Sequence, residues 1–309
     1  MARLSTLLLV TLLLLTGCGG SGNDSSPTGP SATIGVSTLT LTHVFHQDLA
    51  EAFQAAADSL NFEVILVSSE FDVARQQNQV SDFIVQGVDA IVLMPADSKA
   101  IGTSIQAAQD AGIPVFTADI AALDEAGGVV THIATDNYAG GRLAAEAVIE
   151  AIGTEGEVAI IDHPEVESVI QRTRGFTEVI EATNADGGSL DIVAQLSGGG
   201  TKDRAFRVAE DLLQAHPNLA AIFGINDDSA LGAVAAIEKA GKEGQIMVVG
   251  FDGTQEAREA IQAGKIYADV IQHPGDIGRR VALTIDQYLN GESVPPEILI
   301  PASLYGQDD

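Results

Sequence analysis

The chain has 309 residues, of which 46% are hydrophobic and 19% are charged. This length exceeds what one hydrophobic core usually serves, and the apolar share excludes a chain that is disordered throughout. With 15 Lys and Arg against 43 Asp and Glu, the formal net charge is −28, which would repel the phosphates of nucleic acid, so no nucleic-acid partner is expected.

The first segment of the chain predicts an export signal. A short positive start at residues 1–3 precedes the apolar run 7–15, which is far shorter than the roughly 20 residues that span a bilayer. The run ends in Leu-Thr-Gly-Cys at Cys18, the only cysteine, so no internal disulfide can form. Small residues before a lone cysteine resemble the lipobox of bacterial lipoproteins, which implies that residues 1–18 are a signal peptide and that Cys18 is lipidated. Residues 19–32 are rich in Gly, Ser and Pro and predict a flexible linker.

From residue 33 onward, short apolar runs alternate with segments of helical spacing. Parallel strands buried on both faces give such runs, and the alternation predicts an α/β fold with two doubly wound lobes. The first set of expected strands is 34–38, 64–68, 90–94, 115–118 and 132–134, and the second is 158–161, 192–196, 221–225, 247–250 and 268–271. Helical spacing recurs at 49–60, 73–84, 168–183, 203–215, 229–240 and 275–290. Gly87, Gly112 and Gly241 each follow a helical segment, where glycine suits the left-handed end of a helix.

Polar residues gather where the expected strands end. Ligands of open parallel sheets bind beyond the carboxyl ends of the strands, so these positions are candidates for a binding site. The strand ends carry His43, Phe45 and His46 in the first set, followed by Asp97, Asp119 and Asp136. In the second set they carry Asp162, His163, Asn226, Asp252 and Gln272.

Several segments together resemble one family. They are Pro-Ala-Asp-Ser at 95–98, Gly-Ile-Pro-Val at 112–115, the segment 132–137, Asn-Asp-Asp-Ser-Ala-Leu-Gly at 226–232 and Val-Val-Gly-Phe-Asp-Gly at 248–253. In this order they resemble the periplasmic sugar-binding proteins of the ribose-binding type. The resemblance implies two parallel-sheet lobes joined by three crossovers, near Thr135, Gln272 and Pro296. The implied N-terminal lobe is 33–134 plus 273–296, and the implied C-terminal lobe is 135–272 plus 297–309.

The resemblance also implies ligand contacts. Phe45 matches an aromatic ring that stacks on a sugar face, Asp119 a carboxylate that accepts from sugar hydroxyls, and Arg172 an arginine of the second lobe that donates to ligand oxygens. Three further positions match ligand contacts: Asn226, Asp252 and Gln272. If Arg172 and Asp119 hold the ligand from opposite lobes, Arg172→Ala should lower affinity strongly with little effect on stability.

The chain also departs from the pattern of the family's ribose binders. Ile120 stands where those proteins carry an arginine, Met94 where they carry an asparagine and His46 where they carry a second aromatic residue, and a further aromatic position falls near Gly200. These changes remove hydrogen-bond donors and aromatic walls from the expected site, which includes Met94. They favour another pentose or hexose, a polyol or a deoxy sugar over ribose, with His43 and His46 supplying contacts of their own.

Other activities fit the sequence less well. Asp119 and Asp252 could be the carboxylate pair of a glycosidase, but receptor carboxylates explain them equally well, and no Gly-x-Ser-x-Gly elbow is present, so no enzyme is expected. His43 and His46 alone do not make a zinc site, and neither a metal nor a cofactor is expected. A transcriptional repressor is also not expected, because the sequence predicts export and no helix-turn-helix precedes residue 33.

Two functions remain open. The first is a monomeric, lipid-anchored solute-binding protein, held at the cell surface or in the periplasm. It would capture a small sugar or polyol and deliver it to the permease and ATPase of an ABC importer. The alternative is a receptor component that uses the same ligand-driven closure to engage a chemotaxis receptor or a sensor kinase.

Overall fold

The computed structural model describes residues 29–123 and 128–306. Cys18, the signal peptide and most of the expected linker therefore lie outside the described residues. None of the helices in the described part of the chain has the length and apolar character needed to cross a membrane.

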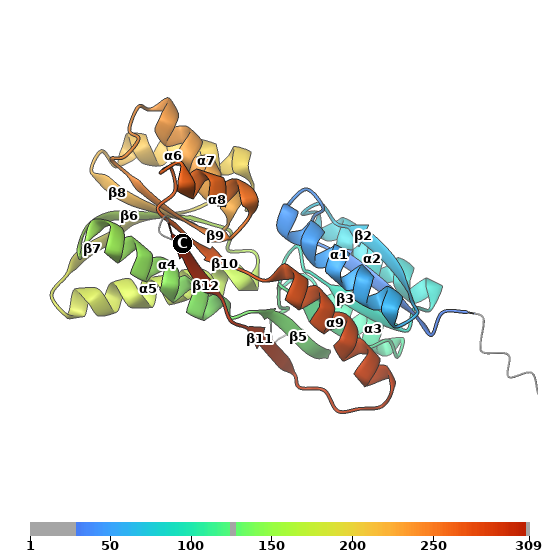
Figure 1. Ribbon diagram of the computed structural model, residues 1–309. Helices are drawn as coiled ribbons and strands as arrows, with labels where there is room; N and C mark the ends of the chain where they lie inside the picture. The colour runs from blue at the N-terminus through green and yellow to red at the C-terminus, as the bar shows by residue number, and fades with distance from the viewer. Residues whose placement is uncertain (1–28, 124–127, 307–309) are drawn as a thin grey trace, which may run out of the picture. The chain divides into compact units, whose positions relative to one another are not determined.

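The first sheet belongs to what we call the N-terminal lobe, and its strand order is β11-β5-β4-β3-β1-β2, with every pair parallel. Helices α1 and α9 pack together on one face of this sheet, and α2 and α3 cover the other face (Figure 1). The lobe consists of β1 (Ala32–Thr38), α1 (Val44–Ser59), β2 (Phe62–Ser68), α2 (Val73–Gln86), β3 (Ala90–Leu93), α3 (Gly102–Asp110), β4 (Val115–Ala118), β5 (Val129–Thr135), α9 (Pro274–Leu289) and β11 (Glu297–Ile300).

The second sheet belongs to the C-terminal lobe, and its order is β12-β10-β9-β8-β6-β7. The edge strand β12 runs antiparallel to β10, whereas the other pairs are parallel. Helices α4 and α5 cover one face, and α6, α7 and α8 lie on the other (Figure 1). The lobe consists of α4 (Asn137–Ile152), β6 (Glu155–Asp162), α5 (Glu167–Ala185), β7 (Ser189–Ser197), α6 (Lys202–Ala215), β8 (Leu219–Gly224), α7 (Asp227–Lys239), β9 (Met247–Asp252), α8 (Gln255–Gln262), β10 (Ala268–Ile271) and β12 (Ser303–Gly306).

The predicted fold class is confirmed, and the two lobes share one topology. In each sheet the first five strands in chain order stand in the order 2-1-3-4-5, the order of doubly wound flavodoxin-like sheets. Alternate residues of the central strands enter opposite cores. In β3, Ala90 and Val92 join the core beneath α1 and α9, while Ile91 and Leu93 join the core beneath α2 and α3.

Local signals set several helix ends. Helix α2 begins after Asp72, whose carboxylate accepts from the Arg75 backbone N–H at 2.9 Å, and it ends at Gly87, whose φ of 68° is left-handed. Helix α7 begins after Asn226, whose side chain accepts from the Ser229 N–H at 2.9 Å. Helix α2 therefore ends at the glycine that the sequence placed after a helix, and both helices begin at a side-chain cap.

The third crossover and the tail of the C-terminal lobe need a correction. The sequence places the crossover near Pro296 and assigns all of 297–309 to the C-terminal lobe. In the structure, Glu297–Ile300 forms β11 and pairs with β5 of the N-terminal lobe, while Ser303–Gly306 forms β12 in the second sheet. The chain therefore crosses between Ile300 and Ser303, because the backbone of β11 completes the hydrogen bonds of β5 before the crossing.

Candidate functional site

A cavity lies at the carboxyl ends of strands from both sheets. Its empty volume is about 420 Å³, a figure that includes space open to solvent. Eight of the nine predicted contact residues line it: His43, Phe45, His46, Asp119, Arg172, Asn226, Asp252 and Gln272. The structure thus brings together side chains that are more than 200 residues apart in the chain.

Arg172 is the buried centre of the polar cluster. It is 4% exposed, and its Nε donates to Asn137 Oδ1 at 2.8 Å while Nη1 donates to the Ile225 carbonyl at 2.8 Å. Its guanidinium lies 3.9 Å from the centre of the Phe251 ring. Arg172 is therefore also a packing residue of the C-terminal lobe, which changes the expectation that its truncation would leave stability intact.

Two glycines allow this placement of Arg172. Gly141 of α4 faces the backbone of α5, where a Cβ would stand 2.0 Å from the Arg172 carbonyl oxygen. Gly175 of α5 lies equally close to the backbone of α4, because a Cβ there would stand 2.2 Å from the Tyr138 carbonyl oxygen. The two helices therefore cross at backbone contact, and Arg172 lies close enough to reach Asn137 at the start of α4.

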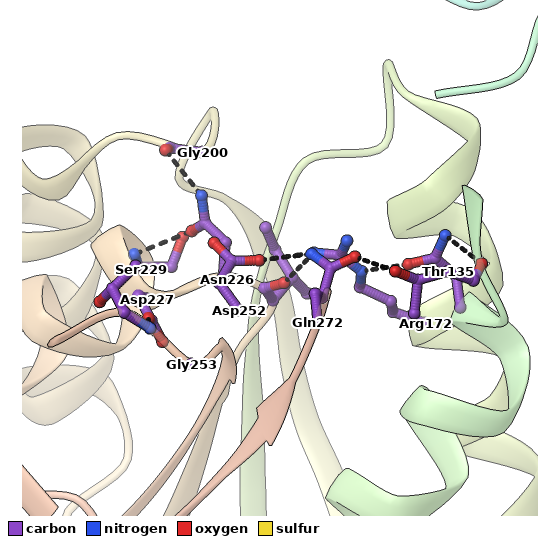
Figure 2. Close-up of polar contacts among 12 residues, drawn as sticks. Thr135, Arg172, Gly200, Asn226, Asp227, Ser229, Asp252, Gly253 and Gln272 are labelled. Atoms are coloured by element: carbon purple, nitrogen blue, oxygen red, sulfur yellow. Dashed lines mark hydrogen bonds and ion pairs between the residues drawn. The ribbon is translucent and has the colours of Figure 1, made fainter. Parts of the chain in front are cut away.

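Gln272 joins the two crossover segments to the site. Its Oε1 accepts from Thr135 Oγ1 at 2.6 Å, and its Nε2 donates to Asp252 Oδ1 at 2.7 Å. Figure 2 shows Asn226, Asp252, Gln272 and Thr135 in a row, with Arg172 beside it. The row therefore connects the ends of β5, β9 and β10 through hydrogen-bonded side chains.

The environment of Asp252 raises the pKa of its carboxyl. Burial and the nearby carboxyl of Asp227 raise the pKa of Asp252 to about 8, although Arg172, with Nη1 3.7 Å from Asp252 Oδ1, acts in the opposite direction. The Asn226 side chain forms hydrogen bonds within the protein at both ends, because its Nδ2 donates to the Gly200 carbonyl at 3.0 Å and its Oδ1 caps α7.

Asp119 and His46, which line the cavity, each carry a buried polar atom that lacks a hydrogen-bond partner. Asp119 Oδ1 and His46 Nδ1 are buried without a hydrogen-bond partner, and both side chains are 4% exposed. Burial raises the pKa of Asp119 to about 6, against the opposing effect of Arg172. Burial, with His43 and Arg172 adding to it, lowers the pKa of His46 to about 3, so that imidazole is neutral. A ligand hydroxyl can donate a hydrogen bond to the Asp119 carboxylate and can also form a hydrogen bond with Nδ1 of the neutral His46 ring.

The wall around His46 is built from rings. Phe45 meets His46 edge-on with their ring centres 5.3 Å apart, and His43 stacks on His46 at 6.1 Å. His43 also crosses to the C-terminal lobe, because its Nε2 lies 2.9 Å from Asp228 Oδ2. In the described part of the chain, no group of three or more His, Cys, Asp or Glu side chains is arranged to hold a metal ion.

Met94 does not line the cavity, and two lining rings were not among the predicted contacts. Met94 is 1% exposed and belongs to the core beneath α1 and α9, with its sulfur 3.2 Å from Thr38 Oγ1. Phe71 and His163 line the cavity from opposite lobes with their ring centres 6.2 Å apart. His163 directly follows β6, so its strand-end position was a usable signal, whereas Phe71 lies in the turn after β2.

Two doubly wound lobes joined by three crossovers, with a polar cavity lined from both, define a two-lobed solute-binding protein. The chain belongs to the periplasmic binding protein domain family, which matches residues 34–293. It is 34% identical to the ribose import binding protein RbsB of Bacillus subtilis over 98% of each chain.

Two solved structures are similar over most of the chain. An ABC transporter solute-binding protein from Agrobacterium vitis with bound D-fucose has a TM-score of 0.84 and 31% identity, covering 90% of this chain and 96% of the other. One from Bacillus halodurans with bound myo-inositol has a TM-score of 0.83 and 29% identity, covering 92% of this chain and 97% of the other.

Proposed function

We propose that the protein captures a small, neutral sugar or polyol between its lobes and delivers it to an ABC importer. The observation that carries this proposal is the pair of unpartnered polar atoms, Asp119 Oδ1 and His46 Nδ1, on two residues that line a cavity otherwise rich in internal hydrogen bonds. Buried polar atoms without partners are costly, and ligand hydroxyls would satisfy them. The relatives named as import binding proteins favour the importer over the signalling alternative.

Ribose is not the favoured cargo. Ile120, which is 2% exposed, lines the cavity next to Asp119, and Gly200 presents no side chain to it. These positions supply neither a charged donor nor a ring. A ligand with fewer acceptor oxygens than ribose, such as a deoxy sugar, suits a lining that lacks these donors.

The binding test is thermal unfolding of the purified protein with D-ribose, D-allose, D-fucose, myo-inositol and glycerol, followed by calorimetry. A ligand at about 100 times its dissociation constant adds roughly 2.7 kcal/mol, which should raise the midpoint by about 5–10 °C. Asp119→Asn should clearly reduce the shift, because asparagine tolerates the left-handed φ of 60° at this position but offers no carboxylate. Asp82→Asn, on the exposed surface of α2, should leave it unchanged. A panel in which no sugar or polyol shifts the midpoint would contradict the proposal.

We further propose that the protein is exported and held at the membrane by lipid on Cys18, with the Gly-, Ser- and Pro-rich sequence that precedes β1 as the linker. The lipobox-like Leu-Thr-Gly-Cys sequence supports this step. In cells, the wild-type protein should fractionate with membranes and incorporate labelled fatty acid. Cys18→Ser should incorporate none, and incorporation equal to that of the wild type would contradict lipidation at this residue.

A further inference from the structure

Two buried carboxyl groups lie beneath the site without lining the cavity. Asp227 is the first residue of α7 and is 3% exposed, and Asp269 lies in β10 and is 0% exposed. Neither is needed for the ligand contacts proposed above. Buried aspartates of this kind are expensive unless they are paired or hydrogen-bonded, so their partners indicate what they do.

Each carboxyl holds one of two consecutive backbone N–H groups. Asp269 Oδ2 accepts from Gly253 N at 3.0 Å, and Asp227 Oδ2 accepts from Thr254 N at 2.8 Å. These residues directly follow Asp252, whose own φ of 136° is unusual for a residue other than glycine. The two aspartates therefore fix the turn that presents Asp252 to the cavity.

The remaining oxygens of the two aspartates lie beside the same glycine, Gly250. Neither Asp227 Oδ1 nor Asp269 Oδ1 has a hydrogen-bond donor from another residue, and a Cβ on Gly250 would lie 3.2 Å and 3.1 Å from them. Both oxygens are therefore buried beside the same residue without a hydrogen bond. Ionised carboxylates only accept hydrogen bonds, so these two oxygens could satisfy each other only with a proton on one of them.

We propose that Asp227 and Asp269 share a single proton and act together as a positioning pair for Asp252. One member stays neutral and donates to the other, which carries one negative charge, while both hold the turn at Gly253 and Thr254. If the shared proton leaves, two adjacent carboxylates repel each other, and the turn loses its anchor. The pair thus makes the geometry of Asp252 sensitive to pH.

The charged neighbours are consistent with one shared proton. Burial, followed by the charge of Asp269, raises the pKa of Asp227 well above its usual value. Burial raises the pKa of Asp269 to about 7; Asp252 acts in the same direction, and Arg258, whose Nε donates to the Gly253 carbonyl at 2.9 Å, acts against it. Arg172 also faces the pair: burial lowers the pKa of its guanidinium, and both carboxyls act in the opposite direction.

The sign of the pH effect follows from these shifts. A carboxyl whose pKa is raised by folding stabilises the native state fully below its unfolded pKa, and this contribution is lost as pH rises through the folded pKa. The wild-type protein should therefore lose stability through this pair as pH rises through about 7, the pKa of Asp269. Asp252 and Asp119 add to the same trend, so a variant is needed to isolate the pair.

Asp227→Asn is that variant, because its amide oxygen can still accept from Thr254 N and its NH₂ group can donate to Asp269. Urea unfolding followed by far-UV circular dichroism measures the midpoint at each pH. We expect the midpoint of Asp227→Asn to fall clearly less than that of the wild type from about pH 5 to about pH 9. Asp203→Asn, in the exposed first turn of α6, should follow the wild type. A slope for Asp227→Asn equal to that of the wild type would overturn the proposal.

A second measurement guards against a variant that fails to fold. Asp269→Asn should flatten the slope in the same way, since either member can be the neutral one. In the wild-type protein near neutral pH, infrared spectroscopy should show a protonated-carboxyl band that weakens in Asp227→Asn. A band of unchanged intensity would contradict proton sharing. Both measurements are made without ligand, so their failure would leave the proposed sugar binding untouched.

Discussion

Replacing Arg172 with alanine should destabilise the protein as strongly as it weakens ligand binding. The guanidinium donates two hydrogen bonds within the protein, to Asn137 and to the Ile225 carbonyl, and stacks on Phe251. Hydrogen bonds to a charged group contribute about 1.5–3 kcal/mol each, and removing one member of a buried ionic cluster costs about 3–5 kcal/mol. We therefore expect a loss of about 3–5 kcal/mol in the free energy of unfolding.

The control for this experiment is two residues further along the same helix. Arg174→Ala removes a side chain that is 62% exposed and pairs with Glu178 at 3.0 Å in an i,i+4 arrangement. Such exposed pairs contribute about 0.3–0.5 kcal/mol, so Arg174→Ala should be nearly neutral. Both variants are compared by urea unfolding at one pH with circular dichroism as the signal. If Arg172→Ala is within about 1 kcal/mol of the wild type, Arg172 is not the packing residue that its contacts indicate.

Three further results are expected. His46→Phe keeps the ring contact with Phe45 but removes the unpartnered Nδ1. Thermal stability should therefore hold or rise, while the affinity for the captured sugar, measured by calorimetry, should fall at least about tenfold. Unchanged affinity would exclude His46 as a contact. Gly141→Ala forces α4 away from α5 and should cost about 1–3 kcal/mol in urea unfolding, and a neutral result would mean that the helices separate freely. Because the pKa of Asp119 is about 6 and hydroxyls donate to its ionised form, affinity should fall as pH drops through about 6; Asp119→Asn should remove that dependence, and a flat wild-type profile would argue against the contact.

The sequence predicts the fold well where local patterns decide it and poorly where distant pairing decides it. Apolar runs and cap residues locate most of the strands and helices. Helix α4 has no clear apolar stripe, because its buried side is built from Gly and Ala that approach α5 and Phe251 closely. The four-residue β11 shows no sign of which sheet it joins, since its partner β5 lies more than 150 residues earlier in the chain.

The sequence likewise predicts the site residues that depend on strand ends, and not those that depend on side-chain direction or turn conformation. Residues at strand ends were predicted to share an edge of each sheet, and eight of them line one cavity. Met94 follows β3 directly, but its side chain turns into the core beneath α1 and α9, a choice that depends on the pleat rather than on position along the chain. Phe71 reaches the cavity from a turn with a φ of 60°, a conformation that residue propensities do not predict for phenylalanine.

The division between satisfied and open polar groups also indicates where ligand specificity resides. The side-chain amides of Asn226 and Gln272 form hydrogen bonds within the protein through both the oxygen and the nitrogen, and Arg172 donates two hydrogen bonds to protein groups. Such groups are preorganised, which lowers the entropy cost of binding but ties their geometry to the stability of the fold. In the N-terminal lobe, by contrast, Asp119 Oδ1 and His46 Nδ1 form no hydrogen bond with the protein. Substitutions in the C-terminal part of the site should therefore change stability together with affinity, whereas those at Asp119 and His46 should change which ligand is bound while the fold persists.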